Sequence, residues 1–137
     1  MHNLPPILVA EDSDDDFFFF RRSMRAASIE NPVLRFRDGS ELTRYLEKLP
    51  AHDPSDSTPW LLFVDITMPI MNGFEVLEWL QGREGLPHLC PIVLSGSLRE
   101  EDVKRGLSLG AIDYLVKPIS PALLGSIVMG ATKAAAA

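Results

Sequence analysis

Short apolar runs constrain the fold of this chain more than any other feature. Five runs of this kind occur, at residues 7–10, 33–36, 60–64, 92–94 and 114–116. The first, third and fourth are apolar throughout, which is typical of strands in a parallel sheet that helices cover on both faces. The second run alternates and is interrupted by Arg35, so we expect it at an edge of the sheet.

Helix-like segments separate the five runs. They extend over residues 13–27, 40–49, 72–80, 99–109 and 121–132. Ser40 is the expected N-cap of the second segment, since a serine side chain accepts free amide hydrogens of a first helical turn. Strands that alternate with helices predict a right-handed, doubly wound α/β sheet in a single domain, residues 1–137. Residues 133–137 are low in complexity, and we expect a disordered tail, an artificial addition or a frayed helix end there.

Four consecutive phenylalanines, residues 17–20, lie in the first helix-like segment. Successive residues of a helix turn by about 100°, so four in a row cannot all face the core. Phe20 and Met24 fit one buried stripe with Phe19 beside it, which leaves at least one of the first two phenylalanines partly exposed. Two interpretations of the exposed ring stay open: a boundary residue under a neighbour, or a contact patch for a partner.

The charge and the hydropathy of the chain argue against two classes of partner. Proteins that bind the phosphate backbone of nucleic acids carry a basic patch, whereas this chain has a net charge of −6. Its densest basic group, Arg21, Arg22 and Arg25, follows three aspartates and is interpreted as a solvated helix face. No apolar stretch approaches the roughly 18 residues of a membrane helix. We therefore expect a soluble, cytoplasmic protein that binds neither nucleic acid nor membrane.

Polar residues follow four of the five apolar runs at the point where each run ends. Glu11 and Asp12 follow the first, Asp65 the third, Ser95 the fourth and Lys117 the fifth. The carboxyl ends of parallel strands share one edge of a sheet, where ligands bind. Three carboxylates at one edge repel each other, and a hard divalent cation, Mg²⁺, would relieve that repulsion. With a hydroxyl and an ammonium beside them, the group predicts phosphoryl chemistry on an aspartate.

Each of these residues also has an ordinary structural interpretation when it is taken alone. An acidic pair after a strand is commonly a helix N-cap cluster, residues 95–97 could form a plain turn, and a lone lysine is usually solvated. Asp65 is the exception, because a charge directly after a buried strand costs several kcal/mol when it is unpaired. A carboxylate placed there can act as a nucleophile toward phosphorus.

Taken together with Met68, Pro69 and Gly73, the set resembles the receiver domain of two-component response regulators, similar to the single-domain CheY type. The resemblance covers residues 6–132 and implies a flavodoxin-like sheet of five parallel strands in the order 2-1-3-4-5, with five helices. The opening at residues 10–16, the turn at residues 37–39 and the long loop at residues 50–59 look more like phytochrome-associated response regulators.

The resemblance implies a role for each acidic residue. Asp65 would accept a phosphoryl group from a histidine kinase or phosphotransfer protein. Asp12, Asp65 and the carbonyl of Thr67 would hold Mg²⁺, and Glu11 would act mostly through water. Two aspartates are commoner in the family where this chain has Glu11 and Asp12.

The same resemblance implies a switch rather than a conventional enzyme. Lys117 would pair with the phosphoryl group, Ser95 would move to bond it, and Tyr114 would change rotamer to follow. Serine stands at position 95 where threonine is commoner. We expect no output domain after the last helix, so the signal would pass to a downstream target protein or through homodimerisation on the face of the fourth helix, fifth strand and fifth helix.

Two other functions compete with this hypothesis. One is a pseudo-receiver, a binding module that never takes phosphate, and the complete set of acidic, hydroxyl and lysine residues argues against it. The other is an aspartyl-phosphate phosphatase of the haloacid dehalogenase type. That type needs a second aspartate two residues after the nucleophile, and here Thr67 occupies that position.

Overall fold

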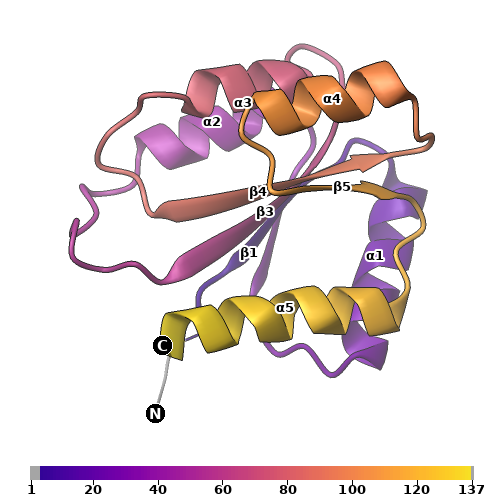
Figure 1. The fold of residues 1–137 in the computed structure, drawn as a ribbon, viewed down its shortest axis with the longest axis horizontal. Coiled ribbons are helices and arrows are strands. Elements are labelled where there is room, and N and C mark those ends of the chain that lie inside the picture. The colour runs from indigo at the N-terminus through magenta and orange to yellow at the C-terminus, as the bar shows by residue number, and fades with distance from the viewer. Residues whose placement is uncertain (1–3, 137) are drawn as a thin grey trace.

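The computed structural model describes residues 4–136, and across them five parallel strands alternate with five helices (Figure 1). The strands are β1 (Ile7–Ala10), β2 (Val33–Phe36), β3 (Pro59–Asp65), β4 (His88–Ser95) and β5 (Asp113–Val116). The helices are α1 (Asp14–Ala26), α2 (Gly39–Glu47), α3 (Gly73–Leu80), α4 (Glu100–Ser108) and α5 (Pro121–Ala136). The sheet order is β2-β1-β3-β4-β5, which confirms the doubly wound topology and places β2 at an edge.

Helices cover the sheet on both faces. Figure 1 shows α1 and α5 on one side, with α2, α3 and α4 on the other. Alternate residues of the central strands point to opposite faces of the sheet and contribute to two separate cores. Val9 and Phe63 belong to the core beneath α1 and α5, whereas Leu8 and Leu62 belong to the core on the opposite face. Burial on both faces explains why these strands are apolar throughout.

The register of the strands brings their carboxyl ends to one edge. Ala10 pairs with Val64, Asp65 pairs with Leu94, and Ser95 pairs with Val116. The residues that end or follow these strands therefore lie side by side although they are far apart in the chain. The fold thus positions the predicted polar residues at the edge where ligands bind in open α/β sheets.

Side-chain caps decide where three of the helices begin. Ser13 caps α1 and Asn72 caps α3, the latter with Glu75 in a reciprocal capping box. The prediction of Ser40 as the cap of α2 was wrong: Asp38 caps this helix by accepting from the amide of Glu41, and Ser40 lies inside the first turn. Asp38 holds an extended backbone and is mostly buried, which suits it to the capping position.

The last helix and the phenylalanine run differ in part from expectation. Helix α5 continues through Ala136, so residues 133–136 are helical rather than a disordered tail, and Ala137 lies outside the described residues. Phe20 is buried as expected and stacks edge-on against Phe63. Phe19, expected beside the buried stripe, is instead 49% exposed, and Phe18 is 61% exposed. Within the described part of the chain, no helix has both the length and the apolar character to cross a membrane.

Candidate functional site

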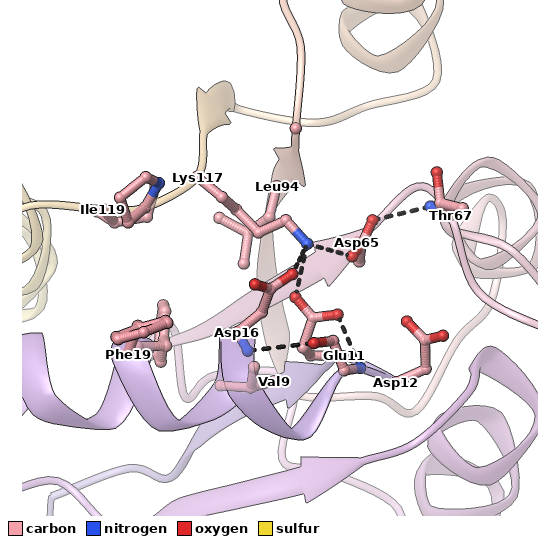
Figure 2. A pocket seen from close by; sticks show the side chains of 14 residues that line it. Val9, Glu11, Asp12, Asp16, Phe19, Asp65, Thr67, Leu94, Lys117 and Ile119 are labelled. Carbon is pink, nitrogen blue, oxygen red and sulfur yellow. Dashed lines mark hydrogen bonds and ion pairs between the residues drawn. The ribbon is translucent and has the colours of Figure 1, made fainter.

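The ammonium of Lys117 is the centre of a cluster of carboxylates at the carboxyl edge of the sheet (Figure 2). Its Nζ atom lies 2.6 Å from Asp65 Oδ2, 2.6 Å from Asp16 Oδ2 and 2.9 Å from Glu11 Oε1. Lys117 follows β5, Glu11 follows β1 and Asp65 ends β3, so three strands meet at this point. The predicted convergence of Glu11, Asp65 and Lys117 is therefore present in the structure.

A side chain and a backbone amide hold the carboxylate of Asp65. The residue is 4% exposed, its Oδ2 binds the Lys117 ammonium, and its Oδ1 accepts from the amide of Thr67 at 2.8 Å. The first turn of α3 lies directly against it: a Cβ atom at Gly73 would stand 2.6 Å from the Asp65 carbonyl oxygen. Glycine at position 73 is therefore what lets the helix approach the strand end so closely.

Asp12 lies at the predicted edge of the sheet but takes no part in the ammonium cluster. It is exposed, and no ion pair joins it to Lys117 among the described residues. It lines the same pocket as Glu11 and Asp65, and Figure 2 shows it on the side nearest Thr67. Asp12 is thus part of the pocket wall and not of the ammonium cluster.

Asp16 is the carboxylate that the sequence analysis missed. It lies in the first turn of α1, where its amide donates to the Ser13 side chain and its carboxylate reaches Lys117. A signal for it was present: Asp16 precedes the buried Phe20 by four residues, and residues four apart share one face of a helix. The same spacing places Asp14 and Asp15 on other faces of α1.

The cluster lies in an open cavity of about 540 Å³. Its lining includes Val9, Glu11, Asp12, Ser13, Asp16, Phe19, Phe20, Asp65, Thr67, Leu94, Gly96, Lys117, Pro118 and Ile119. Apolar residues of β1, β4 and α1 form part of the wall, while the polar groups converge at the end of β3. The peptide bond between Lys117 and Pro118 is cis.

Burial and charge shift the ionisation of two residues at the site. Burial, followed by the hydrogen bond with Asp65, raises the pKa of Glu11 from 4.5 to about 7, against the opposing effect of Lys117. Burial by itself would lower the pKa of Lys117, but the hydrogen bonds to Asp16, Asp65 and Glu11 outweigh it and raise that pKa. Lys117 therefore stays charged and offsets part of the negative charge.

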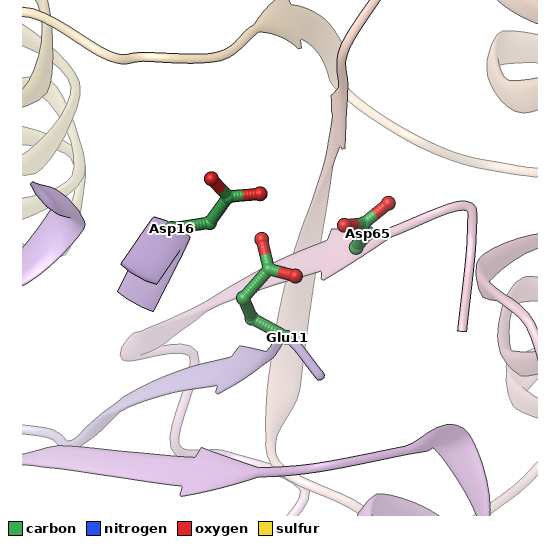
Figure 3. A group of neighbouring side chains, drawn as sticks. All are labelled: Glu11, Asp16 and Asp65. Carbon is green, nitrogen blue, oxygen red and sulfur yellow. The ribbon is translucent and has the colours of Figure 1, made fainter. Parts of the chain in front are cut away.

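The donor set fits a hard divalent cation. One carboxylate oxygen from each of Glu11, Asp16 and Asp65 lies within 4.8 Å of the others (Figure 3). Such anionic oxygens are the ligands that Mg²⁺ prefers, usually with water completing its shell. One ammonium balances only part of this charge, so a cation in the pocket would be electrostatically favoured.

Among the described residues, neither Ser95 nor Tyr114 forms a hydrogen bond with Asp65. Ser95 is buried at the end of β4, where its Oγ accepts from the Ser97 amide at 3.2 Å and its carbonyl accepts from the Lys117 amide at 2.8 Å. Tyr114 is 7% exposed and packs against the backbone of Gly106, and its hydroxyl is buried without a hydrogen-bond partner in the described structure. Their predicted movements on phosphorylation stay predictions.

Arg35, which the sequence suggested only as an edge residue, supports the loop that carries the acids. Its Nε donates to the carbonyl of Glu11 at 3.1 Å, and its Nη1 lies 2.7 Å from Asp14. The guanidinium also stacks over the ring of Phe17, 4.8 Å from its centre. Strand β2 thereby fixes the backbone of the segment between β1 and α1.

Comparison with known proteins agrees with this architecture. The sequence profile described as "Response regulator receiver domain" matches residues 7–129. The chain is 32% identical over 125 residues to the phosphate regulon transcriptional regulatory protein PhoB of Rhizobium meliloti, covering 90% of this chain and 51% of PhoB. The chain therefore spans about half the length of that relative.

Solved structures of response regulators superpose on nearly the whole chain. The bacteriophytochrome response regulator AtBRR has a TM-score of 0.77 at 27% identity, over 96% of this chain and 94% of that one. The phosphorylated cyanobacterial phytochrome response regulator RcpA has a TM-score of 0.70 at 25% identity, over 93% of this chain and 90% of RcpA. With the profile match and the site at the carboxyl edge of the sheet, these likenesses show that the chain belongs to the family of response regulator receiver domains.

Proposed function

We propose that this receiver domain accepts a phosphoryl group on Asp65 from a histidine kinase or phosphotransfer protein and then signals by changing its conformation. The observation that carries the proposal is the pairing of the buried Asp65 carboxylate with Lys117, 2.6 Å away, beside an open cavity. A carboxylate held in this way presents an oxygen to an incoming phosphorus atom, and the Lys117 ammonium lies beside it.

In the proposed transfer, an Asp65 oxygen forms a bond to the phosphorus of a phosphohistidine as the phosphorus–nitrogen bond breaks. The bonding electrons leave with the imidazole nitrogen, so the reaction needs no redox partner. Lys117 supplies positive charge to the transferred group, since an ammonium acts as a point charge toward phosphate. The Thr67 amide, which already donates to Asp65, keeps the carboxylate oriented.

We further propose Mg²⁺ as the cofactor. Asp12 and Asp65 would hold it, Glu11 would act mostly through water, and the carbonyl of Thr67 remains a predicted ligand. When bound, the ion supplies positive charge to the oxygens of the phosphoryl group. The carboxylates of the site carry more negative charge than the single ammonium of Lys117 neutralises, and this excess would attract the ion.

The partner and output of the protein are proposed from its relatives. Likeness to AtBRR and RcpA supports a histidine kinase of the phytochrome type as the donor, and the phosphorylated form of RcpA supports phosphorylation of this chain. A stand-alone, cytoplasmic role and a homodimer through α4, β5 and α5 remain predictions.

Incubation with acetyl phosphate and Mg²⁺ tests the proposal directly. Intact-mass spectrometry should detect the gain of one phosphoryl group on the wild type and none on Asp65→Asn, which keeps the size of the side chain but removes the nucleophilic carboxylate. Beryllofluoride, a mimic of the phosphoryl group, should change the amide NMR spectrum of the wild type alone.

Other outcomes would favour the competing functions. If the wild type gains no mass and its spectrum does not respond to beryllofluoride, the protein is a pseudo-receiver. If the protein turns over a simple phosphate ester, the phosphatase is favoured instead. In a separate titration, Asp12→Ala should bind Mg²⁺ much more weakly than the wild type, and unchanged affinity would remove Asp12 from the set of ligands.

A further inference from the structure

Asp16 is the acidic residue of the cluster to which the proposed transfer assigns no role. Its Oδ2 lies as close to the Lys117 ammonium as that of Asp65 does, 2.6 Å in each case. It comes from α1, whereas Asp65 comes from β3, and Figure 2 shows the two carboxylates reaching the ammonium from different elements. Lys117 is therefore shared between the phosphoacceptor and a helix residue.

Two features hold Asp16 in this place. The Asp16 amide donates to the Ser13 side chain at 3.2 Å, which fixes the first turn of α1. Phe20 and Met24, four and eight residues further on, are buried against the sheet and orient this face of the helix toward it. The carboxylate is thus directed at Lys117 by the packing of the whole helix.

We propose that Asp16 is a positioning residue that shares Lys117 with Asp65 and thereby opposes the phosphorylated state. Phosphorylation would add an anionic group at Asp65, and oxygens of Asp16 and Asp65 lie within 4.8 Å of each other. The new group then competes with Asp16 for one ammonium and is repelled by its negative charge. The inference rests on the proposed function, because it concerns how readily that site holds a phosphoryl group.

The charge of Asp16 acts in opposite directions on a cation and on an anion. Removing the charge makes the pocket less negative, so Mg²⁺ should bind more weakly. The same change leaves Lys117 more available to an anionic group on Asp65, so beryllofluoride should bind more tightly at saturating Mg²⁺. If the substitution only disturbed the geometry of the site, both Mg²⁺ and beryllofluoride would bind more weakly. Opposite changes in the two affinities therefore indicate an effect of charge.

Asp16→Asn and Asp15→Asn form a matched pair for this test. Both remove one negative charge from the first turn of α1, but Asp15 is exposed and pairs with no cation in the described structure. Isothermal titration of Asp16→Asn should show Mg²⁺ affinity reduced about fivefold and beryllofluoride affinity raised about fivefold, the effect of one nearby charge in a solvated site. Asp15→Asn should stay within about twofold of the wild type for both, since its charge is solvated and screened.

A third measurement, made without Mg²⁺ or beryllofluoride, tests the contact between Asp16 and Lys117 directly. In the NMR spectrum of the lysine ammonium groups, the Lys117 signal should shift in Asp16→Asn and stay in place in Asp15→Asn. If the wild type binds neither Mg²⁺ nor beryllofluoride, the proposed function itself fails. If the wild type binds both but the two variants behave alike, or if Asp16→Asn weakens both ligands, the role given to Asp16 is wrong.

Discussion

Lys117 and Asp65, 52 residues apart in the chain, are joined by a contact of 2.6 Å between the ammonium and a carboxylate oxygen. The pairing depends on three strands being in register, since β4 lies between β3 and β5 in the sheet. Asp65 is almost fully buried, so its charge needs this partner. The contact is therefore both a structural requirement and the basis of the proposed chemistry.

Lys117→Ala should destabilise the protein when no metal is present. The substitution leaves Glu11, Asp16 and Asp65 close together without their shared cation, which we expect to lower the free energy of unfolding by about 1–3 kcal/mol. Urea denaturation at neutral pH measures this, and millimolar Mg²⁺ should restore part of the loss. The control is Lys104→Ala, which removes a fully solvated pair with Glu100 and should change the free energy by less than about 1 kcal/mol. Equal effects of the two substitutions would contradict the structural role of Lys117.

The pH dependence of stability should reveal the shifted pKa of Glu11. This carboxyl has a pKa of about 7 in the folded protein and 4.5 in the reference state, so the folded state holds a proton that the unfolded state releases between these values. Stability of the metal-free protein should therefore fall as pH rises from about 4.5 to 7, by about 3 kcal/mol from this group. Above pH 7 the contribution is constant.

Glu11→Gln should flatten this part of the pH profile because an amide does not titrate. The free energy of unfolding, measured by urea denaturation at pH 5, 6, 7 and 8, provides the comparison. The matched control, Glu47→Gln on the exposed side of α2, should keep the slope of the wild type. A slope that survives in Glu11→Gln would assign the dependence to another group.

Gly73→Ala should destabilise the protein because the added methyl group would clash with backbone atoms. The added Cβ would stand 2.6 Å from the Asp65 carbonyl oxygen and 2.9 Å from the Ile66 Cα, and these backbone atoms cannot move aside as a flexible side chain would. We expect a loss of about 1–3 kcal/mol in the free energy of unfolding, and a displaced Asp65 that is phosphorylated more slowly by acetyl phosphate. Gly130→Ala in α5 is the control: its Cβ meets no atom within 4 Å, so stability should be unchanged or raised by up to about 1 kcal/mol.

Tyr114→Phe should not destabilise the protein, although the residue is buried. The hydroxyl of Tyr114 has no hydrogen-bond partner in the described structure, so its removal relieves a desolvated polar group. Thermal and urea denaturation should show stability unchanged or raised by about 1 kcal/mol, whereas Tyr114→Ala should lose about 3–5 kcal/mol by leaving a cavity. A clear loss of stability in Tyr114→Phe would show that the hydroxyl is bonded in solution.

Much of the fold could be predicted from the sequence because a strand that is buried on both faces is apolar at every position. The runs at residues 7–10, 60–64 and 92–94 are apolar throughout, and each is a central strand in the structure. Parallel strands also share one carboxyl edge, so residues that end them were predicted to meet without any knowledge of their distances. Glu11, Asp65 and Lys117 do meet there.

Other features were decided only by the tertiary structure. Asp14, Asp15 and Asp16 are identical in type and consecutive, and which of them reaches Lys117 depends on the rotation of α1 about its own axis. That rotation is set by the packing of Phe20 and Met24 against the sheet, which also leaves Phe19 exposed. The rotation of one helix and the register of strands far apart in the chain are properties of the assembled core, and neighbouring residues in the sequence do not encode them locally.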